Sequence, residues 1–89
     1  EKDLEDGFKF YERQSIGLGS YFLDSLYSDI DSLKFFEGIH AKVFGYYRLL
    51  SKRFPFAVYY RLAEKEVLVM AVLDCRRNPS WIRERLMDA

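Results

Sequence analysis

Cysteine and histidine are almost absent from this chain, and each scarcity excludes a class of site. Cys75 is the only cysteine among the 89 residues, so the chain forms no internal disulfide. His40 is the only histidine, which excludes a metal site built from several imidazoles. The longest apolar run covers residues 67–73, far below the roughly 20 residues that span a bilayer. We therefore expect a cytoplasmic protein that has no membrane span, no metal and no other cofactor.

The chain does contain enough apolar side chain for one hydrophobic core. Hydrophobic residues make up 49% of the sequence and aromatic residues 18%, whereas disordered chains are poor in both. A chain of this length supports one ordinary domain. We expect a single folded domain over residues 1–89.

The formal net charge of zero hides an uneven distribution. Residues 1–37 hold nine acidic and four basic side chains, a net charge of −5, so residues 38–89 carry a net charge of +5. A basic half of this kind creates a local positive potential that attracts an anionic partner. The alternative is a solvated surface over which lysine and arginine are scattered.

The first part of the chain repeats apolar residues at helical spacing, three or four positions apart. One series is Leu4, Phe8 and Tyr11, and the second is Leu18, Phe22, Leu26, Ile30 and Leu33. Between the two series, Gly17 and Gly19 permit the positive φ angles of a sharp turn. The pattern predicts a helical hairpin whose second helix ends at Gly38.

The spacing then changes to runs rich in β-branched and aromatic residues. Residues 43–50, 56–62 and 67–73 predict three strands, which short loops join into an antiparallel meander. Alternation along the second run lets one face of the sheet meet the helices. The third run is apolar on both faces, which is typical of a central strand. Residues 64–65 are predicted to form the hairpin turn between the second and third strands.

The chain ends in a predicted short helix. Asn78 can cap the free amides of a helix that begins at Pro79 and continues to about Met87. Together the elements predict an α+β fold, in which an N-terminal helical hairpin packs on a small antiparallel sheet and a short helix follows.

Catalytic side chains are scarce, and the arginines are the best candidates for a site. Cys75 and His40 could form a nucleophile pair on counting alone, but no acid or amide stands out to orient them. Arginine presents a planar fork of donors that pairs with phosphate or carboxylate. Four arginines lie on or at the ends of predicted strands, where they could converge: Arg48, Arg61, Arg76 and Arg77.

Three segments carry a resemblance to a known family. Residues 47–50 read Tyr-Arg-Leu-Leu, residues 53–61 read Arg-Phe-Pro-Phe-Ala-Val-Tyr-Tyr-Arg, and residues 72–79 read Val-Leu-Asp-Cys-Arg-Arg-Asn-Pro. With the preceding helices and their Gly-Leu-Gly turn, they resemble the RelE/ParE toxins of bacterial type II toxin–antitoxin systems, and the ParE-like, plasmid stabilisation branch most closely. The resemblance extends over nearly the whole chain and implies a helical hairpin on an antiparallel sheet. Family members usually begin with a short strand that this sequence lacks before its first helix.

The resemblance implies an inhibitor of growth that a cognate antitoxin neutralises. ParE-like members poison DNA gyrase by binding it, whereas RelE-like members cut messenger RNA on the ribosome without a metal. Arg48 and Arg76 match basic positions of the nuclease pattern, but Leu50 and Ala57 fall where further basic groups are expected, and Ile82 falls near the expected tyrosine. Because phosphoryl transfer needs positive charge placed at the transition state, we expect gyrase binding. The alternatives are a ribosome-dependent endoribonuclease and a non-toxic, degenerate binding module.

The resemblance also suggests which residues contact the target and the antitoxin. The target-contact candidates are Arg76, Arg77, Trp81 and Arg83, and the basic strand face is expected to hold Arg48 and Arg61. Two alternatives stay open, because Trp81 could instead hold its helix on the sheet and Arg76 could pair with Asp74. The antitoxin is expected to use a hydrophobic groove beside the helical hairpin, together with basic residues.

Overall fold

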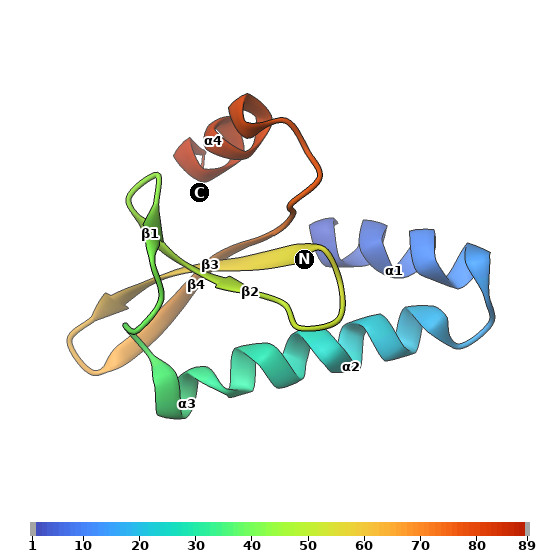
Figure 1. Ribbon diagram of the computed structural model, residues 1–89, viewed down its shortest axis with the longest axis horizontal. Helices are drawn as coiled ribbons and strands as arrows, with labels where there is room; N and C mark the ends of the chain where they lie inside the picture. Colours follow the sequence, from blue (N-terminus) through green and yellow to red (C-terminus); the bar gives the residue numbers. More distant parts are fainter. Residues whose placement is uncertain (1, 89) are drawn as a thin grey trace.

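The computed structural model describes residues 2–88 and confirms the α+β fold. Helices α1 (Lys2–Gln14) and α2 (Leu18–Asp31) form an antiparallel hairpin, and a short α3 (Leu33–Phe36) follows. Four strands then form a sheet: β1 (Lys42–Val43), β2 (Tyr46–Leu50), β3 (Phe56–Ala63) and β4 (Glu66–Asp74). The chain continues into α4 (Pro79–Met87), which lies on the other side of the sheet from the hairpin (Figure 1).

The two glycines of the predicted turn have different roles. Gly17 has φ 89° and precedes α2, as the turn requires. Gly19 lies inside α2 at ordinary helical φ, so its expected role in the turn is wrong. A Cβ at Gly19 would lie 2.8 Å from the Phe8 carbonyl oxygen, so this glycine lets α1 and α2 approach closely. The Glu12 carboxylate caps α2 by accepting hydrogen bonds from the backbone N–H groups of Gly17 (3.0 Å) and Gly19 (2.9 Å).

The second predicted helix is divided near its end. The Ser32 hydroxyl donates a hydrogen bond to the Asp29 carbonyl (2.6 Å), and the chain resumes as α3. Gly38, at φ 81°, ends this helical region as expected. No strand precedes α1 within residues 2–88.

The first predicted strand is in fact two strands. Phe44 (φ 54°) and Gly45 (φ 88°) both have positive φ, the combination of a tight type I′ turn. This turn folds β1 back on β2, and Val43 pairs with Tyr46. The sheet is therefore a four-stranded antiparallel meander rather than the predicted three-stranded one, in the order β1-β2-β3-β4.

The third predicted run forms β4, which is an edge strand and not the expected central one. Its two faces are apolar because helices cover both sides of the sheet: Val72 packs against the α1–α2 hairpin, and Leu73 packs against α4. Tyr59 pairs with Ala71 and Tyr60 with Val69, so Met70 forms a β-bulge. The bulge changes which face successive residues of β4 occupy.

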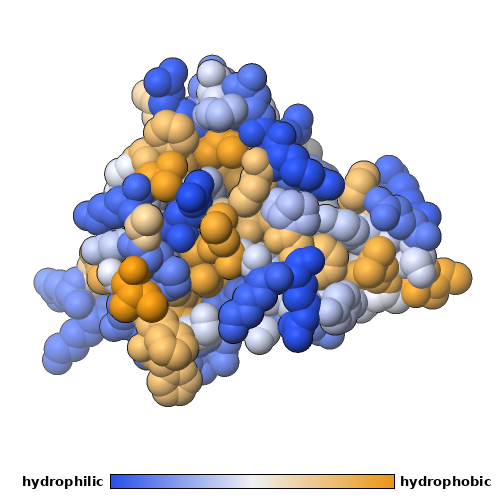
Figure 2. All heavy atoms as spheres, viewed as in Figure 1, coloured by the Kyte–Doolittle hydropathy of each residue, from blue (hydrophilic) through white to orange (hydrophobic). Residues whose placement is uncertain are grey.

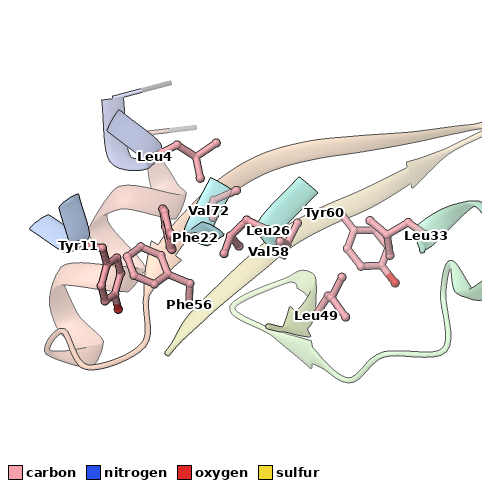
Figure 3. Close-up of a cluster of buried hydrophobic side chains, with 10 residues drawn as sticks. All are labelled: Leu4, Tyr11, Phe22, Leu26, Leu33, Leu49, Phe56, Val58, Tyr60 and Val72. Carbon is pink, nitrogen blue, oxygen red and sulfur yellow. The ribbon is translucent and has the colours of Figure 1, made fainter. Parts of the chain in front are cut away.

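Two hydrophobic clusters hold these layers together. The larger cluster joins the hairpin to one face of the sheet (Figure 3). Burial of its Phe22 and Tyr60 side chains, which are fully buried, contributes about 1.5–3 kcal/mol each to the free energy of folding. The smaller cluster joins α4 to the opposite face through Ala57, Tyr59, Ala71, Leu73, Ile82 and Leu86. The predicted start of α4 is confirmed, because Asn78 accepts a hydrogen bond from the Ser80 amide (2.8 Å) and Pro79 is its first residue.

Candidate functional site

The sheet face on the α4 side brings together the predicted basic strand residues. Arg48 on β2 pairs with Tyr59 on β3, and Arg61 lies two positions beyond Tyr59, so both arginines share that face. The intervening residues Tyr60 and Leu49 point into the hairpin core on the opposite face. Arg61 is exposed and Arg48 half-buried. The alternation predicted from sequence places Arg61 on the face of Tyr59, and the observed register of β2 against β3 adds Arg48 to that face.

Arg48 lies in a polar cluster beside Tyr59 and Cys75. Burial raises the pKa of the Tyr59 hydroxyl, and the neighbouring Arg48 guanidinium opposes this rise. Burial also raises the pKa of the Cys75 thiol, again against the opposing effect of Arg48. The residue as a whole is exposed, but enough protein surrounds the thiol to disfavour its thiolate. Cys75 therefore lacks the lowered pKa of a reactive cysteine.

His40 lies on the other side of the sheet from Cys75 and does not orient it. The Tyr60 hydroxyl accepts a hydrogen bond from the Gly38 amide (2.9 Å) and lies 2.5 Å from His40 Nδ1. This hydroxyl belongs to the hairpin core, whereas Cys75 lies beside Tyr59. The cysteine–histidine pair considered from the sequence is therefore not formed, and His40 instead anchors the loop between α3 and β1.

Arg76 is held away from the Arg48 cluster by an acidic partner. Its backbone N–H and Nε donate to Asp74 Oδ1 (2.9 and 3.0 Å), and a terminal nitrogen donates to Asp74 Oδ2 (2.8 Å). The guanidinium also lies 5.6 Å from the Phe10 ring of α1 and interacts with the Tyr11 hydroxyl. The alternative that Arg76 pairs with Asp74 is confirmed. Arg76 thus lies on the hairpin side of the sheet, and it does not converge with Arg48.

Burial alone would raise the pKa of Asp74. The hydrogen bonds from the Arg76 side chain and backbone outweigh burial, so the pKa of this carboxyl is lower than its ordinary value. Asp74 therefore stays ionised at neutral pH and keeps Arg76 oriented. Sequence reasoning gave Asp74 only this pairing role, and its position two residues before Arg76 was the available signal.

Arg77 and Trp81 lie next to Arg76 around a small cavity at the start of α4. The cavity of about 240 Å³ is bordered by α1, the end of β4 and α4, and its walls include Asp3, Asp6 and Asp74. The Arg77 guanidinium lies 4.3 Å from the centre of the Trp81 ring, within cation–π range. Trp81 is half-buried and packs on the cluster beneath α4, so it also holds this helix on the sheet.

A second arginine of α4 covers part of the same ring. The Arg85 guanidinium lies 5.3 Å from the Trp81 ring and pairs with Asp3 of α1, a contact that ties the two helices together. Neither Arg85 nor Asp3 stood out in the sequence, because their meeting depends on how α1 and α4 pack. With two guanidinium groups against it, the Trp81 ring has less open surface for a partner.

Arg83 lies apart from the other target-contact candidates. It borders a shallow hollow of about 290 Å³ together with Phe44, Tyr46, Leu86 and Met87. Phe44 and Met87 are exposed large apolar side chains. The candidates therefore divide into one group around the Arg76–Arg77–Trp81 cavity and a second, apolar-basic group around Arg83. The second group includes two residues of the β1–β2 hairpin, which the sequence did not reveal.

The described residues contain no cluster of three or more His, Cys, Asp or Glu side chains suited to a metal ion. Within residues 2–88 no helix is both long and apolar enough to cross a membrane. Comparisons with protein-family models, with curated proteins and with solved structures find no match for this chain.

Proposed function

We propose that this protein is a growth-inhibiting toxin of the RelE/ParE type that acts by binding DNA gyrase, and that a cognate antitoxin neutralises it. The fold supports the proposal, because an α-hairpin packed on an antiparallel meander is what the resemblance implies. The residues that carry the resemblance also lie where the layers meet. Phe54 packs edge-on against Phe22 of α2, and the Pro55 carbonyl accepts a hydrogen bond from the Cys75 amide (2.8 Å).

The observation that carries the binding mechanism is the separation of the two nuclease candidates. Arg48 faces the α4 side, whereas Arg76 is fixed by Asp74 on the hairpin side. Leu50 and Ala57, which replace further basic groups of the nuclease pattern, pair across β2 and β3. This part of the sheet is thus apolar where phosphoryl transfer would need positive charge, and an apolar-basic surface suits binding of another protein.

The proposed gyrase surface is the α4-side face of the molecule. Arg61 and Arg83 are both exposed, and among residues 2–88 neither side chain forms a hydrogen bond or an ion pair. Their guanidinium groups are therefore available to carboxylates of a partner. Arg77 and Trp81 form a separate group at the start of α4, around the cavity that α1 also borders. The antitoxin would relieve toxicity by covering the protein.

The test follows labelled thymidine and labelled methionine incorporation in an antitoxin-free bacterium during the first minutes after induction. We expect DNA synthesis to fall first, and purified protein to inhibit gyrase supercoiling. The double variant Arg61→Glu/Arg83→Glu should fold normally and lose inhibition, because reversed charges repel an acidic partner. Arg13→Glu, an exposed position at the end of α1, is the matched charge control and should stay toxic.

Two other results would replace the proposal. If protein synthesis falls first and purified protein cuts ribosome-bound message, the ribosome-dependent endoribonuclease is correct, and Arg76→Ala should then stop the cutting. If neither synthesis falls while folded protein accumulates, the chain is a binding module without toxicity.

A further inference from the structure

Exposed apolar side chains gather where α3 meets the loop that leads to β1. Phe35 is 80% exposed, Ile39 72% and Phe36 54%, and the Phe35 and Phe36 rings lie 6.4 Å apart. The Ile39 amide donates a hydrogen bond to the Phe36 carbonyl (3.5 Å), which keeps Ile39 beside the two rings. Leu62 of β3, 41% exposed, extends this surface, because a Cβ at Gly38 would lie 3.2 Å from Leu62 Cδ1. We call these side chains, Phe35, Phe36, Ile39 and Leu62, the α3 patch.

The loop that carries this patch is anchored to the hydrophobic core. The buried Tyr60 hydroxyl accepts a hydrogen bond from the Gly38 amide (2.9 Å) and lies 2.5 Å from His40 Nδ1. On the helical side, the Ser32 hydroxyl donates a hydrogen bond to the Asp29 carbonyl and fixes the start of α3. The apolar side chains are therefore held on an ordered backbone, so a partner that covers them loses little of its binding free energy to ordering this loop.

The α3 patch is separate from the edge of β4. A groove of about 840 Å³, the β4 groove, lies between β4 and the α2–α3 segment. Lys34 and Glu37 line this groove, whereas Phe35 and Phe36, which lie between them in the sequence, do not. Because 3.6 residues complete one helical turn, Phe35 and Phe36 point to other sides of α3. Figure 1 shows α3 at the opposite end of the molecule from the turn between α1 and α2.

Opposite charges flank the patch on its two sides. Glu37 lines the β4 groove together with Val69 of β4, whereas Lys42 Nζ lies 4.9 Å from the centre of the Tyr47 ring of β2. Tyr60 of β3 lies between these strands, because it pairs with Tyr47 on one side and with Val69 on the other. The anchored loop lies over Tyr60, so Glu37 and Lys42 lie on opposite sides of it.

A second copy of this chain complements the arrangement. In a two-fold pair each patch contacts the same patch of the other copy, so Glu37 of each copy can face Lys42 of the other. Both side chains are exposed, and among residues 2–88 neither forms an ion pair within its own chain. The nearby Lys34 is already paired with Asp31 (2.8 Å). The patch itself contains no charged side chain, so it does not select a strongly acidic or basic partner.

The area of the patch fits a weak dimer. A fully exposed side chain of this size offers about 150–250 Å², so the exposed fractions of the four side chains give roughly 400–500 Å² per copy. Two copies would bury about 800–1,000 Å² of apolar surface, and the flanking polar residues bring the total to about 1,200 Å², the lower limit of standard specific interfaces. We therefore expect a dissociation constant in the micromolar range.

We propose that this protein forms a two-fold homodimer through the α3 patch, with Glu37 of each copy against Lys42 of the other. The proposal does not rest on the proposed function, because the patch lies on the hairpin side of the sheet, whereas Arg61 and Arg83 of the proposed gyrase surface lie on the α4 side.

Sedimentation equilibrium of the intact protein, from micromolar to several hundred micromolar, tests the dimer. The wild type should change from monomer to dimer within this series. Phe35→Lys should stay monomeric at every concentration, because it places a charge in the centre of the contact. Ile16→Lys is the matched control: Ile16 is 97% exposed but lies at the turn between α1 and α2, so this variant should dimerise like the wild type. Thermal unfolding of each variant confirms that it is folded.

A mixture of charge variants identifies the partner as a second copy. Glu37→Lys and Lys42→Glu should each weaken the dimer about tenfold or more, because like charges then face each other. Mixed in equal amounts, the two variants should associate with each other, because every contact between the two proteins again joins opposite charges.

The proposal is overturned if the wild type stays monomeric throughout the series, or if Phe35→Lys dimerises as tightly as the wild type. It is also overturned if the mixed variants associate no more tightly than either variant alone, since Glu37 and Lys42 then do not meet between copies. A monomeric wild type whose gyrase binding is lost in Phe35→Lys would assign the patch to gyrase instead of a second copy.

Discussion

Replacing Gly19 by alanine should destabilise the protein although the residue lies inside a helix. In an unconstrained helix the change would stabilise by about 1 kcal/mol. Here the new Cβ would lie 2.8 Å from both the Phe8 carbonyl oxygen and the Phe8 ring, and 2.9 Å from Glu12 Oε1. The carbonyl belongs to the α1 backbone, so no rotation of a side chain can relieve this contact, and the two helices must separate.

The expected cost combines overpacking with a weakened helix cap. Overpacking costs about 1–3 kcal/mol, and a displaced Glu12 carboxylate weakens a charged hydrogen bond worth about 1.5–3 kcal/mol. After subtracting the gain in helix propensity, we expect a net loss of about 1–3 kcal/mol in the free energy of unfolding. For a domain of this size, that lowers the melting temperature by roughly 5–20 °C.

Thermal and urea unfolding of three variants tests this reasoning. Gly17→Ala is the matched control, because nothing lies within 4 Å of its Cβ and its only cost is the positive φ, about 1–2 kcal/mol. Adding Phe8→Ala should not rescue Gly19→Ala, because the Phe8 carbonyl oxygen remains. If Gly19→Ala melts at or above the temperature of the wild type, the close approach of α1 and α2 is not what requires glycine.

Two further predictions concern buried polar groups. Tyr60→Phe removes the hydroxyl bonded to Gly38 and His40 and should cost about 1–3 kcal/mol in urea unfolding. Burial raises the pKa of Tyr60 above 10.0. The contribution of its hydroxyl to stability is therefore complete below pH 10.0 and is lost as the pH rises through the folded-state pKa. Tyr60→Phe should reduce this loss of stability at alkaline pH, and an unchanged dependence of the unfolding free energy on pH would contradict the prediction. The pKa of Asp74 is instead lowered from 3.8, so its contribution is present above pH 3.8 and is lost as the pH falls through the folded-state value. Asp74→Asn should reduce the fall in the free energy of unfolding at acidic pH. If the variant loses as much stability at low pH as the wild type, the pair with Arg76 adds no stability.

The helices could be predicted from the sequence because the residues that specify them, the apolar positions and the capping residues, lie within or next to each helix. Apolar spacing located α1 and α2, and Asn78 with Pro79 located the start of α4. The β1–β2 turn was not predicted from the sequence, because its first residue, Phe44, has positive φ, a conformation uncommon for an aromatic residue. Gly45 was the only signal, and it lay inside a run that otherwise reads as one strand.

The position of β4 in the sheet and the position of Arg76 depend on tertiary contacts, which sequence patterns do not show. The apolar run of β4 indicates that both of its faces are buried, but burial by helices on two sides does not require a strand on each edge. Strand alternation was enough to place Arg61 on the face of Tyr59, whereas Arg48 joins that face through the register that pairs it with Tyr59. The position of Arg76 depends on Asp74 and on Phe10 of a helix more than sixty residues away, which strand periodicity cannot reveal.

Exposed apolar side chains gather near the same end of the molecule as the β4 groove. Phe35 is 80% exposed and Ile39 72%, and Figure 2 shows apolar atoms at the α3 end of the visible face. A monomer rarely leaves such large side chains together in water without a partner. They lie beside Lys34 and Glu37 of the groove, and a second copy of the chain would remove them from water.

The uneven charge of the sequence corresponds to two separate surfaces of the folded protein. The acidic residues Asp24, Asp31 and Glu37 line the β4 groove, whereas Arg48 and Arg61 lie on the α4-side face of the sheet. Because the sheet separates these surfaces, two partners can bind together without competing for the same side chains. Asp24→Lys, on the acidic surface, should therefore leave the proposed gyrase binding unchanged. Loss of that binding in the variant would instead show that the two surfaces are coupled.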